Sequence, residues 1–193
     1  MTEALALVVL PLVASAIHAL GFWRYNSQAK AGSSKPNFVS WAIWAFLASL
    51  NALSFRAITS SVVAATPFVG AVGCIGTFIH ALVTGKFEWP DWKEWAILAI
   101  SLVTVVVWKF YSPLYANLVL VSAFVFSCWP SWKGVWKNPT KEKALPWLLW
   151  GSAYGLTTLA IFLGSGLSLK LTMPIISTLA HLAVPAICAI RKK

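Results

Sequence analysis

The chain has 193 residues, of which 59% are hydrophobic and only 10% carry a charge. Soluble domains carry roughly 25% charged residues, so this composition excludes an ordinary soluble domain and indicates a protein with several membrane-spanning helices. Nucleic-acid binding is excluded despite the formal net charge of +10, because the basic residues lie in short segments between apolar runs, where they act as topology signals.

Seven helices are predicted from these apolar runs, since lipid offers no hydrogen-bond partner to an open backbone. In chain order they cover residues 2–22, 38–57, 61–85, 94–110, 114–132, 145–164 and 169–190. The first is predicted to be a retained helix, because it lacks the basic start and the cleavage site of a signal peptide. Polar loops are predicted at residues 23–37 and after residue 132. The predicted fold class is therefore an all-α membrane protein with seven transmembrane helices.

Small residues inside the runs are predicted to serve helix packing. Gly70, Gly73 and Gly76 follow one another at three-residue spacing in the third helix, which lets a neighbouring helix approach closely. The three cysteines, Cys74, Cys128 and Cys188, are isolated within apolar runs, where cysteine usually behaves as a small buried apolar residue.

The basic residues are distributed unevenly between the two sides of the membrane. With the segment after the first helix in the cytoplasm, twelve of them lie on the cytoplasmic side and three on the outer side. The cytoplasmic set is Arg24, Lys30, Lys35, Lys86, Lys93, Lys133, Lys137, Lys141, Lys143, Arg191, Lys192 and Lys193, and the outer set is Arg56, Lys109 and Lys170. The positive-inside rule therefore predicts an outer amino terminus and a cytoplasmic carboxyl terminus. The expected location is the plasma (inner) membrane.

Landmarks in the sequence recur at a nearly constant offset, which indicates an internal duplication. Trp23 and Trp129, Lys35 and Lys141, Trp41 and Trp147, and Trp44 and Trp150 are each 106 residues apart, and Pro67 and Pro174 are 107 apart. The predicted division is a first three-helix repeat at 1–85, an interfacial loop and linker helix at 86–112, and a second three-helix repeat at 113–193. Because three is odd, a single linker helix gives both repeats the same orientation in the membrane.

This plan, together with one segment, resembles the PQ-loop and SWEET superfamily of seven-helix transporters. The segment is Pro130-Ser131-Trp132-Lys133-Gly134-Val135-Trp136-Lys137-Asn138-Pro139-Thr140-Lys141. It is similar to the family's Pro-Gln pair, basic loop and aromatic helix start, with Ser131 in place of the glutamine and Arg24 at the first-repeat position of Pro130. Cys74 and His181 occupy the positions where SWEETs place asparagine. The nicotinamide riboside transporters are a second similar group, and the resemblance implies two parallel repeats and transport of a small molecule.

Matching polar and aromatic residues in the second and sixth helices predict a binding site. Trp44, Ala48 and Asn51 have the spacing i, i+4, i+7, and Trp150, Tyr154 and Thr157 repeat it at the offset of 106. Each set shares one helix face, so the two faces are predicted to meet in a central cavity. The alternative is that the tryptophans are interfacial anchors and the polar groups bond neighbouring helices. The anchor interpretation is favoured for Trp41 and Trp147, and it is also given to Trp89 and Trp92.

Histidines are the other candidates, because ionisable residues inside a membrane are usually functional. His181, in the middle of the seventh helix, is predicted to line the cavity, and Asn117 of the fifth helix is a weaker candidate. For His18 and His80, which are expected toward the cytoplasmic ends of their helices, a neutral ring bonded to a backbone carbonyl is favoured.

The predicted function is facilitated transport of a small uncharged polar or ring-bearing metabolite by alternating access. The alternative is a receptor-like membrane protein of the same fold that binds a ligand without moving it. An enzyme is not expected, since the sequence has no catalytic constellation, no metal-ligand spacing and no cofactor motif. The predicted partners are the lipid bilayer and the small-molecule substrate, and homo-oligomerisation is left open.

Overall fold

The computed structural model describes residues 3–34, 38–84, 92–140 and 142–191, and these residues are almost entirely helical. The helices are α1 (Glu3–Lys30), α2 (Phe38–Ile58), α3 (Ser61–Thr84), α4 (Trp92–Phe110), α5 (Pro113–Lys137), α6 (Ala144–Ser165), the short 3₁₀ helix η1 (Leu169–Leu171) and α7 (Thr172–Arg191). Within this part of the chain six helices, all but α4, are long and apolar enough to cross a membrane, as expected for an integral membrane protein. The 19-residue α4 carries Lys93, Glu94 and Lys109.

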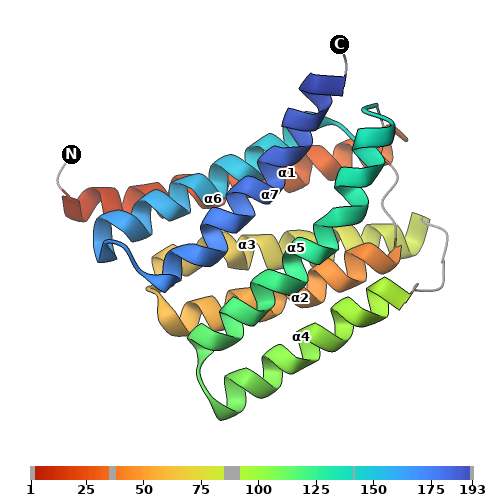
Figure 1. The fold of residues 1–193 in the computed structure, drawn as a ribbon. Helices are drawn as coiled ribbons and strands as arrows, with labels where there is room; N and C mark the ends of the chain where they lie inside the picture. The colour runs from red at the N-terminus through yellow and green to blue at the C-terminus, as the bar shows by residue number, and fades with distance from the viewer. Residues whose placement is uncertain (1–2, 35–37, 85–91, 141, 192–193) are drawn as a thin grey trace.

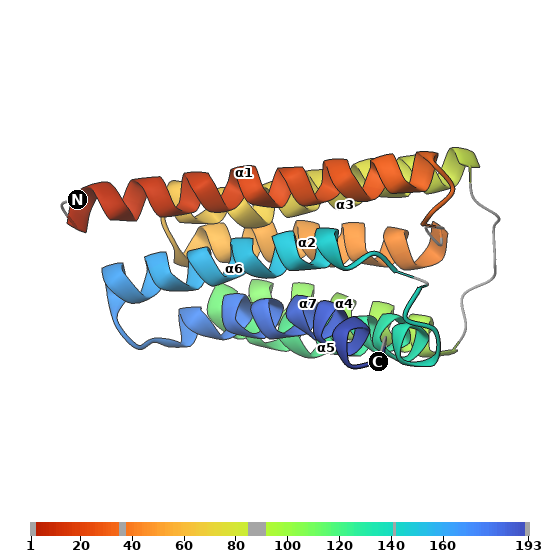
Figure 2. The same cartoon turned by 90° about the horizontal axis from the view of Figure 1, so that it is seen from above.

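The seven α-helices lie along one long axis, and each runs opposite to the one before it (Figures 1 and 2). As a result α1, α3, α5 and α7 all end where α2, α4 and α6 begin. We call this the basic end, because Lys30, Lys93, Lys133 and Lys137 lie there. The opposite end carries Arg56, Lys109 and Lys170. An odd number of helices places the start of α1 and the end of α7 at different ends of the bundle.

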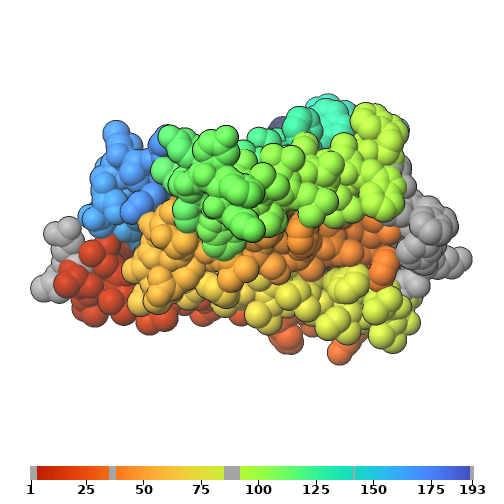
Figure 3. All heavy atoms as spheres, turned by 90° about the horizontal axis from the view of Figure 1, so that it is seen from below, coloured from red at the N-terminus to blue at the C-terminus, as the bar shows by residue number. Residues whose placement is uncertain are grey.

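For description we take α1, α2 and α3 as a first group of three helices and α5, α6 and α7 as a second, with α4 between them in the chain. In the first group α3 packs against both α1 and α2, and in the second α7 packs against both α5 and α6. The groups meet through two main interfaces, α1 with α6 and α2 with α5. The remaining helix, α4, packs on α5 and α2 at one side of the bundle, where the space-filling view shows it (green) above α2 (orange) (Figure 3).

Two helices continue well past their predicted ends. The segments predicted as loops after residues 22 and 132 are helical as far as Lys30 and Lys137. These polar residues were predicted to form loops, but no proline lies between Trp23 and Lys30 or between Lys133 and Lys137, and both stretches are helical. The 28-residue α1 is about 42 Å long, which is longer than a hydrocarbon core of about 30 Å requires. It ends before Gly32, whose φ of 69° suits a helix terminus.

The glycines of α3 make room for rings on α1. A Cβ at Gly70 would lie 2.8 Å from Cε1 of His18, and a Cβ at Gly73 would overlap the ring of Phe22. A Cβ at Gly76 would meet nothing within 4 Å. The close packing predicted for these glycines is confirmed at Gly70 and Gly73 and is wrong at Gly76, which is exposed.

Candidate functional site

The two groups of three helices enclose a small cavity, which we call the inner chamber. Its volume is about 60 Å³. The side chains around it come from both groups and from all six helices of those groups: His18, Phe22, Trp41, Trp44, Leu47, Ala48, Asn51, Gly70, Cys74, Leu120, Phe124, Cys128, Trp147, Trp150, Tyr154, Met173 and His181. Among the residues that the structure describes, no side chain with a full charge lines the chamber.

Four tryptophans form one wall of the inner chamber, and we call them the tryptophan square. The ring centroids are 4.9 Å apart for Trp41 and Trp44, 6.0 Å for Trp44 and Trp147, 5.5 Å for Trp147 and Trp150, and 6.4 Å for Trp41 and Trp150. Every one of these contacts is edge-to-face, the geometry that aromatic quadrupoles favour. Exchanging Trp41 with Trp147 and Trp44 with Trp150, the pairs 106 residues apart, converts each side of the square into the opposite side, so the square is approximately two-fold symmetric.

Two histidines face each other across a tyrosine inside the chamber. The ring of Tyr154 is stacked on His181 at 5.6 Å and meets His18 edge-on at 5.1 Å. Nδ1 of His18 is 3.0 Å from the carbonyl of Thr66, and Nδ1 of His181 is 2.6 Å from the carbonyl of Ser177. A carbonyl only accepts hydrogen bonds, so each Nδ1 carries the proton, and in the neutral ring Nε2 is left as an acceptor.

A polar layer links the two groups on the side of the chamber away from the basic end. Nδ2 of Asn117 donates to Oδ1 of Asn51 at 2.9 Å and to Oγ of Ser54 at 3.1 Å, which joins α5 to α2. Oγ1 of Thr157 donates to Oγ1 of Thr66 at 3.1 Å, which joins α6 to α3. These five residues are almost fully buried. Beyond them an apolar cluster closes the opposite end: Phe55, Val63, Ala64, Ile161 and Leu171.

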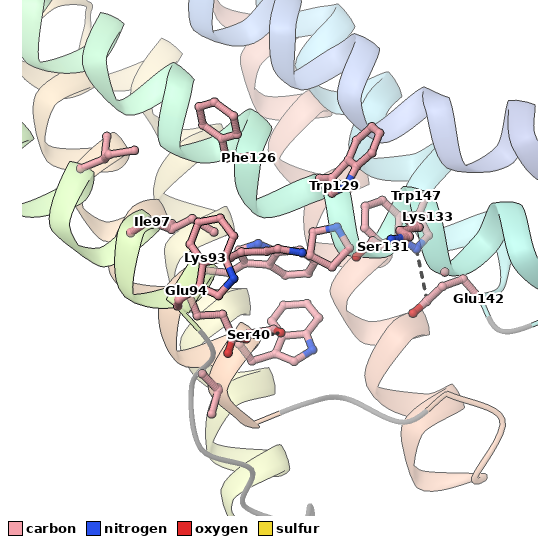
Figure 4. Close-up of a pocket in the computed structure, with 18 of the residues that line it drawn as sticks. Ser40, Lys93, Glu94, Ile97, Phe126, Trp129, Ser131, Lys133, Glu142 and Trp147 are labelled. Carbon is pink, nitrogen blue, oxygen red and sulfur yellow. Dashed lines mark hydrogen bonds between the residues drawn. The ribbon is translucent and has the colours of Figure 1, made fainter.

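A larger cavity, which we call the vestibule, lies at the basic end (Figure 4). Its volume is about 810 Å³, and its walls come from α1, α2, α4, α5 and the start of α6. Trp41, Trp44 and Trp147 line both the vestibule and the inner chamber. The tryptophan square therefore separates the two cavities.

The predicted site residues fall into two sets. Trp44, Asn51, Trp150, Tyr154 and His181 all line the inner chamber. Asn117 and Thr157 do not; they lie in the polar layer directly beyond it.

The anchor interpretation of Trp41 and Trp147 is wrong, because only 3% and 2% of these side chains are exposed. The first turns of α2 and α6 were expected at the membrane surface, but the extended ends of α1 and α5 cover them. Tyr25 packs on Trp41 at 5.0 Å, and Val135 belongs to the same buried cluster. Trp92 is 74% exposed at the vestibule rim, and Trp89 lies outside the described residues.

His18 lies near the middle of α1, deeper than predicted, because α1 extends to Lys30. Its bond to a backbone carbonyl is as predicted, but it also lines the inner chamber. His80 is partly buried in α3 and is not among the residues around the chamber.

Some of the chamber residues that were not predicted lie at the offset of the predicted duplication. Six pairs of chamber residues are related by the repeat offset, of 106 residues in five pairs and 107 in the last. They are His18 and Phe124, Phe22 and Cys128, Trp41 and Trp147, Trp44 and Trp150, Ala48 and Tyr154, and Cys74 and His181. Applying the offset to the first and fifth helices would have identified His18, Phe22, Phe124 and Cys128.

The chamber combines aromatic faces with hydrogen-bonding groups. Tyr154 contributes a hydroxyl, the two histidines contribute ring nitrogens, and Asn51 contributes an amide NH₂. No group of three histidine, cysteine, aspartate or glutamate side chains within the described ranges could hold a metal ion. Comparison of the chain with family models, with curated proteins and with solved structures finds no match.

Proposed function

We propose that the protein is a transporter that moves a small uncharged polar or ring-bearing metabolite across the membrane by alternating access. The observation that carries this proposal is the inner chamber, which lies between the two three-helix groups and is lined by six residue pairs from the duplication. Transporters built from repeats usually bind their substrate where the repeats meet. The resemblance to the PQ-loop and SWEET superfamily points the same way.

The arrangement of the helices supports two parallel repeats joined by a linker helix. The third helix of each group packs between the other two, as α3 does with α1 and α2 and α7 does with α5 and α6. If α1, α2 and α3 correspond to α5, α6 and α7, then the interface of α1 with α6 corresponds to that of α5 with α2. In Figure 2 α1 and α5 run in the same direction, which is expected of parallel repeats and not of inverted ones.

The chemistry of the inner chamber favours an uncharged substrate. Bringing an unpaired charge into a site without a counter-charge costs several kcal/mol or more, and the described part of the chamber offers none. Aromatic faces suit a planar ring, while the tyrosine, histidine and asparagine groups suit hydroxyl or amide groups on a substrate. Ligand sites usually measure roughly 300–1,000 Å³, so a chamber of about 60 Å³ is too small for such a ligand and must widen to admit it.

The two barriers around the chamber define the transport cycle. On one side the tryptophan square separates the chamber from the vestibule, and on the other the polar layer joins the two groups. Rocking of one group against the other would open these barriers in turn. By the positive-inside rule the vestibule faces the cytoplasm, the amino terminus lies outside and the carboxyl terminus inside, in the plasma membrane.

Uptake into proteoliposomes tests this function. Purified protein is first screened for thermal stabilisation by sugars, nucleosides and vitamins, and the stabilising compound is then supplied in radiolabelled form to the vesicles. The proposal expects uptake that saturates and that the Trp150→Ala variant loses. Saturable binding without uptake would establish the receptor-like alternative instead.

A further inference from the structure

The vestibule contains charged groups, which the described walls of the inner chamber lack. Three lysines and two glutamates line it: Lys93, Lys133, Lys137, Glu94 and Glu142, which leaves one net positive charge. Both carboxylates accept hydrogen bonds from the vestibule wall. Oε1 of Glu94 accepts from Oγ of Ser40 at 3.4 Å, and Oε2 of Glu142 accepts from Nε1 of Trp147 at 3.3 Å, the bond drawn in Figure 4.

One face of α5 combines rings with cationic groups. Phe126, Trp129, Lys133 and Lys137 all line the vestibule, and their spacing of three, four and four residues places them along a single stripe of the helix. The two lysines are neighbours on successive turns, so their ammonium groups can approach one anion together. This stripe exists because α5 continues to Lys137, where the sequence predicted a loop.

The vestibule also has the size and the wall of a ligand site. Its volume of about 810 Å³ lies within the roughly 300–1,000 Å³ of ligand pockets. Trp41, Trp44 and Trp147 form its floor, and Trp92 and Trp129 lie on its walls. Indole faces bind planar rings, and lysine ammonium groups bind phosphate as point charges.

We propose that the vestibule binds a phosphate monoester that carries a planar ring, with the ring against the indole walls and the phosphate at Lys133 and Lys137. Such a ligand stops at the tryptophan square, because the uncharged chamber beyond it gives a phosphate no partner. The binding itself does not depend on transport, so it holds or fails independently of the function proposed above.

Phenyl phosphate is the probe for this site. Its affinity for the purified full-length protein in neutral detergent is measured by isothermal titration calorimetry. We expect binding that weakens at least tenfold in the double variant Lys133→Gln/Lys137→Gln, and that weakens as salt rises. The control is Lys109→Gln/Lys170→Gln, which removes two lysines at the opposite end and leaves the affinity unchanged.

A matched pair of tryptophans tests the ring contact. Trp129 and Trp23 are repeat partners with 57% and 58% of their surface exposed, but only Trp129 lines the vestibule. We expect Trp129→Leu to weaken phenyl phosphate binding and Trp23→Leu to leave it intact. Phenol has the ring without the phosphate, and inorganic phosphate has the phosphate without the ring. Both should bind more weakly than phenyl phosphate.

Three results would overturn the proposal: no binding of phenyl phosphate at millimolar concentration, equal binding by the two lysine double variants, or equal binding by the two tryptophan variants. Nanodiscs distinguish a soluble ligand from a lipid headgroup. If phosphatidylglycerol nanodiscs abolish the binding that phosphatidylcholine nanodiscs retain, the lysines hold a lipid phosphate and the site for a soluble ligand is rejected. All variants are compared only where their thermal unfolding matches that of the wild type.

Discussion

At the scale of single residues, the position of His18 depends on the absence of a side chain at Gly70. A Cβ there would lie 2.8 Å from the imidazole, too close for any real contact, whereas a Cβ at Gly76 would enter open space. His18 cannot move away freely, because Nδ1 is bonded to the Thr66 carbonyl and the ring packs against Phe22 and Tyr154. Gly70 and Gly76 therefore allow the same substitution to be compared at a crowded and at an open position of one helix.

Gly70→Ala is expected to destabilise the protein by about 1–3 kcal/mol, the usual cost of overpacking a core. Gly76→Ala should be neutral or stabilising by up to about 1 kcal/mol, since alanine is the better helix former. Thermal unfolding of both variants in the same detergent measures the difference. Equal melting temperatures would show that His18 is not confined as described.

Asn51 and Trp150 are the residues on which ligand binding should depend most. Both side chains line the inner chamber and are almost fully buried. The Nε1 of Trp150 has no hydrogen-bond partner among the described residues, so it is available to a ligand. Asn51→Ala or Trp150→Ala should abolish binding of the compound found in the stabilisation screen. The Asn51 change also removes one of the two acceptors of the Asn117 amide, which costs about 1–3 kcal/mol of stability.

Trp23→Ala serves as the control for these two variants, because Trp23 is 58% exposed and is not among the chamber residues. It should bind the compound as the wild type does. Retained binding after loss of both Asn51 and Trp150, in a double variant that is still folded, would exclude the inner chamber as the binding site.

At the scale of helices, the polar layer is the gate that the proposed transport cycle requires on the side opposite the vestibule. The bond of Thr157 to Thr66 and the bonds of Asn117 to Asn51 and Ser54 each cross from one three-helix group to the other. Thr157→Val keeps the shape of the side chain and removes its hydroxyl donor. The expected consequence is a shift of the protein toward the conformation that is open at the opposite end.

The native cysteines of the chamber report this shift. Cys74 and Cys128 line the inner chamber, so a membrane-impermeant thiol reagent supplied at the opposite end should label them faster in Thr157→Val than in the wild type. Thr158→Val is the control, because the Thr158 hydroxyl bonds only within its own helix, to the Tyr154 carbonyl. Equal labelling rates in the two variants would mean that the polar layer is not a gate.

The sequence predicted most helix boundaries closely, because proline, glycine and charged residues punctuate the apolar runs. The predicted span of the second helix differs from α2 by one residue at its end, and the sixth helix by one residue at each end. The ends of α1 and α5 could not be predicted in the same way. Hydropathy marks the apolar part of a helix, and these two helices continue past that part as far as Lys30 and Lys137.

The lining of the inner chamber was predictable where residues recur at the repeat offset and not where packing decides the outcome. Trp44 and Trp150, which are 106 residues apart, both line the inner chamber. Whether a polar residue reaches that chamber or bonds a neighbouring helix depends on how closely the helices pack. The spacing of residues along one helix gives no information about that distance. Thr157 therefore bonds Thr66, although it shares a helix face with Trp150.

At the scale of the whole molecule, the positive-inside rule predicts the orientation from the distribution of basic residues between the two ends. Single cysteines at Arg56 and at Lys137, in a variant without native cysteines, test it with an impermeant reagent added to intact cells. The residue-56 cysteine at the opposite end should react, and the residue-137 cysteine at the basic end should react only after the cells are opened. The reverse pattern would place the vestibule outside the cell.

The central claim is that one chamber between the two three-helix groups opens to each side of the membrane in turn. The most direct measurement is side-specific labelling of Cys74 and Cys128 in a Cys188→Ser background, in right-side-out and inside-out vesicles. Cys188 is removed because it is buried elsewhere, near the Pro139 carbonyl. Alternating access predicts that both chamber cysteines react from either side and that a bound substrate slows both reactions. Reaction from the basic end alone, or from neither side, would contradict it.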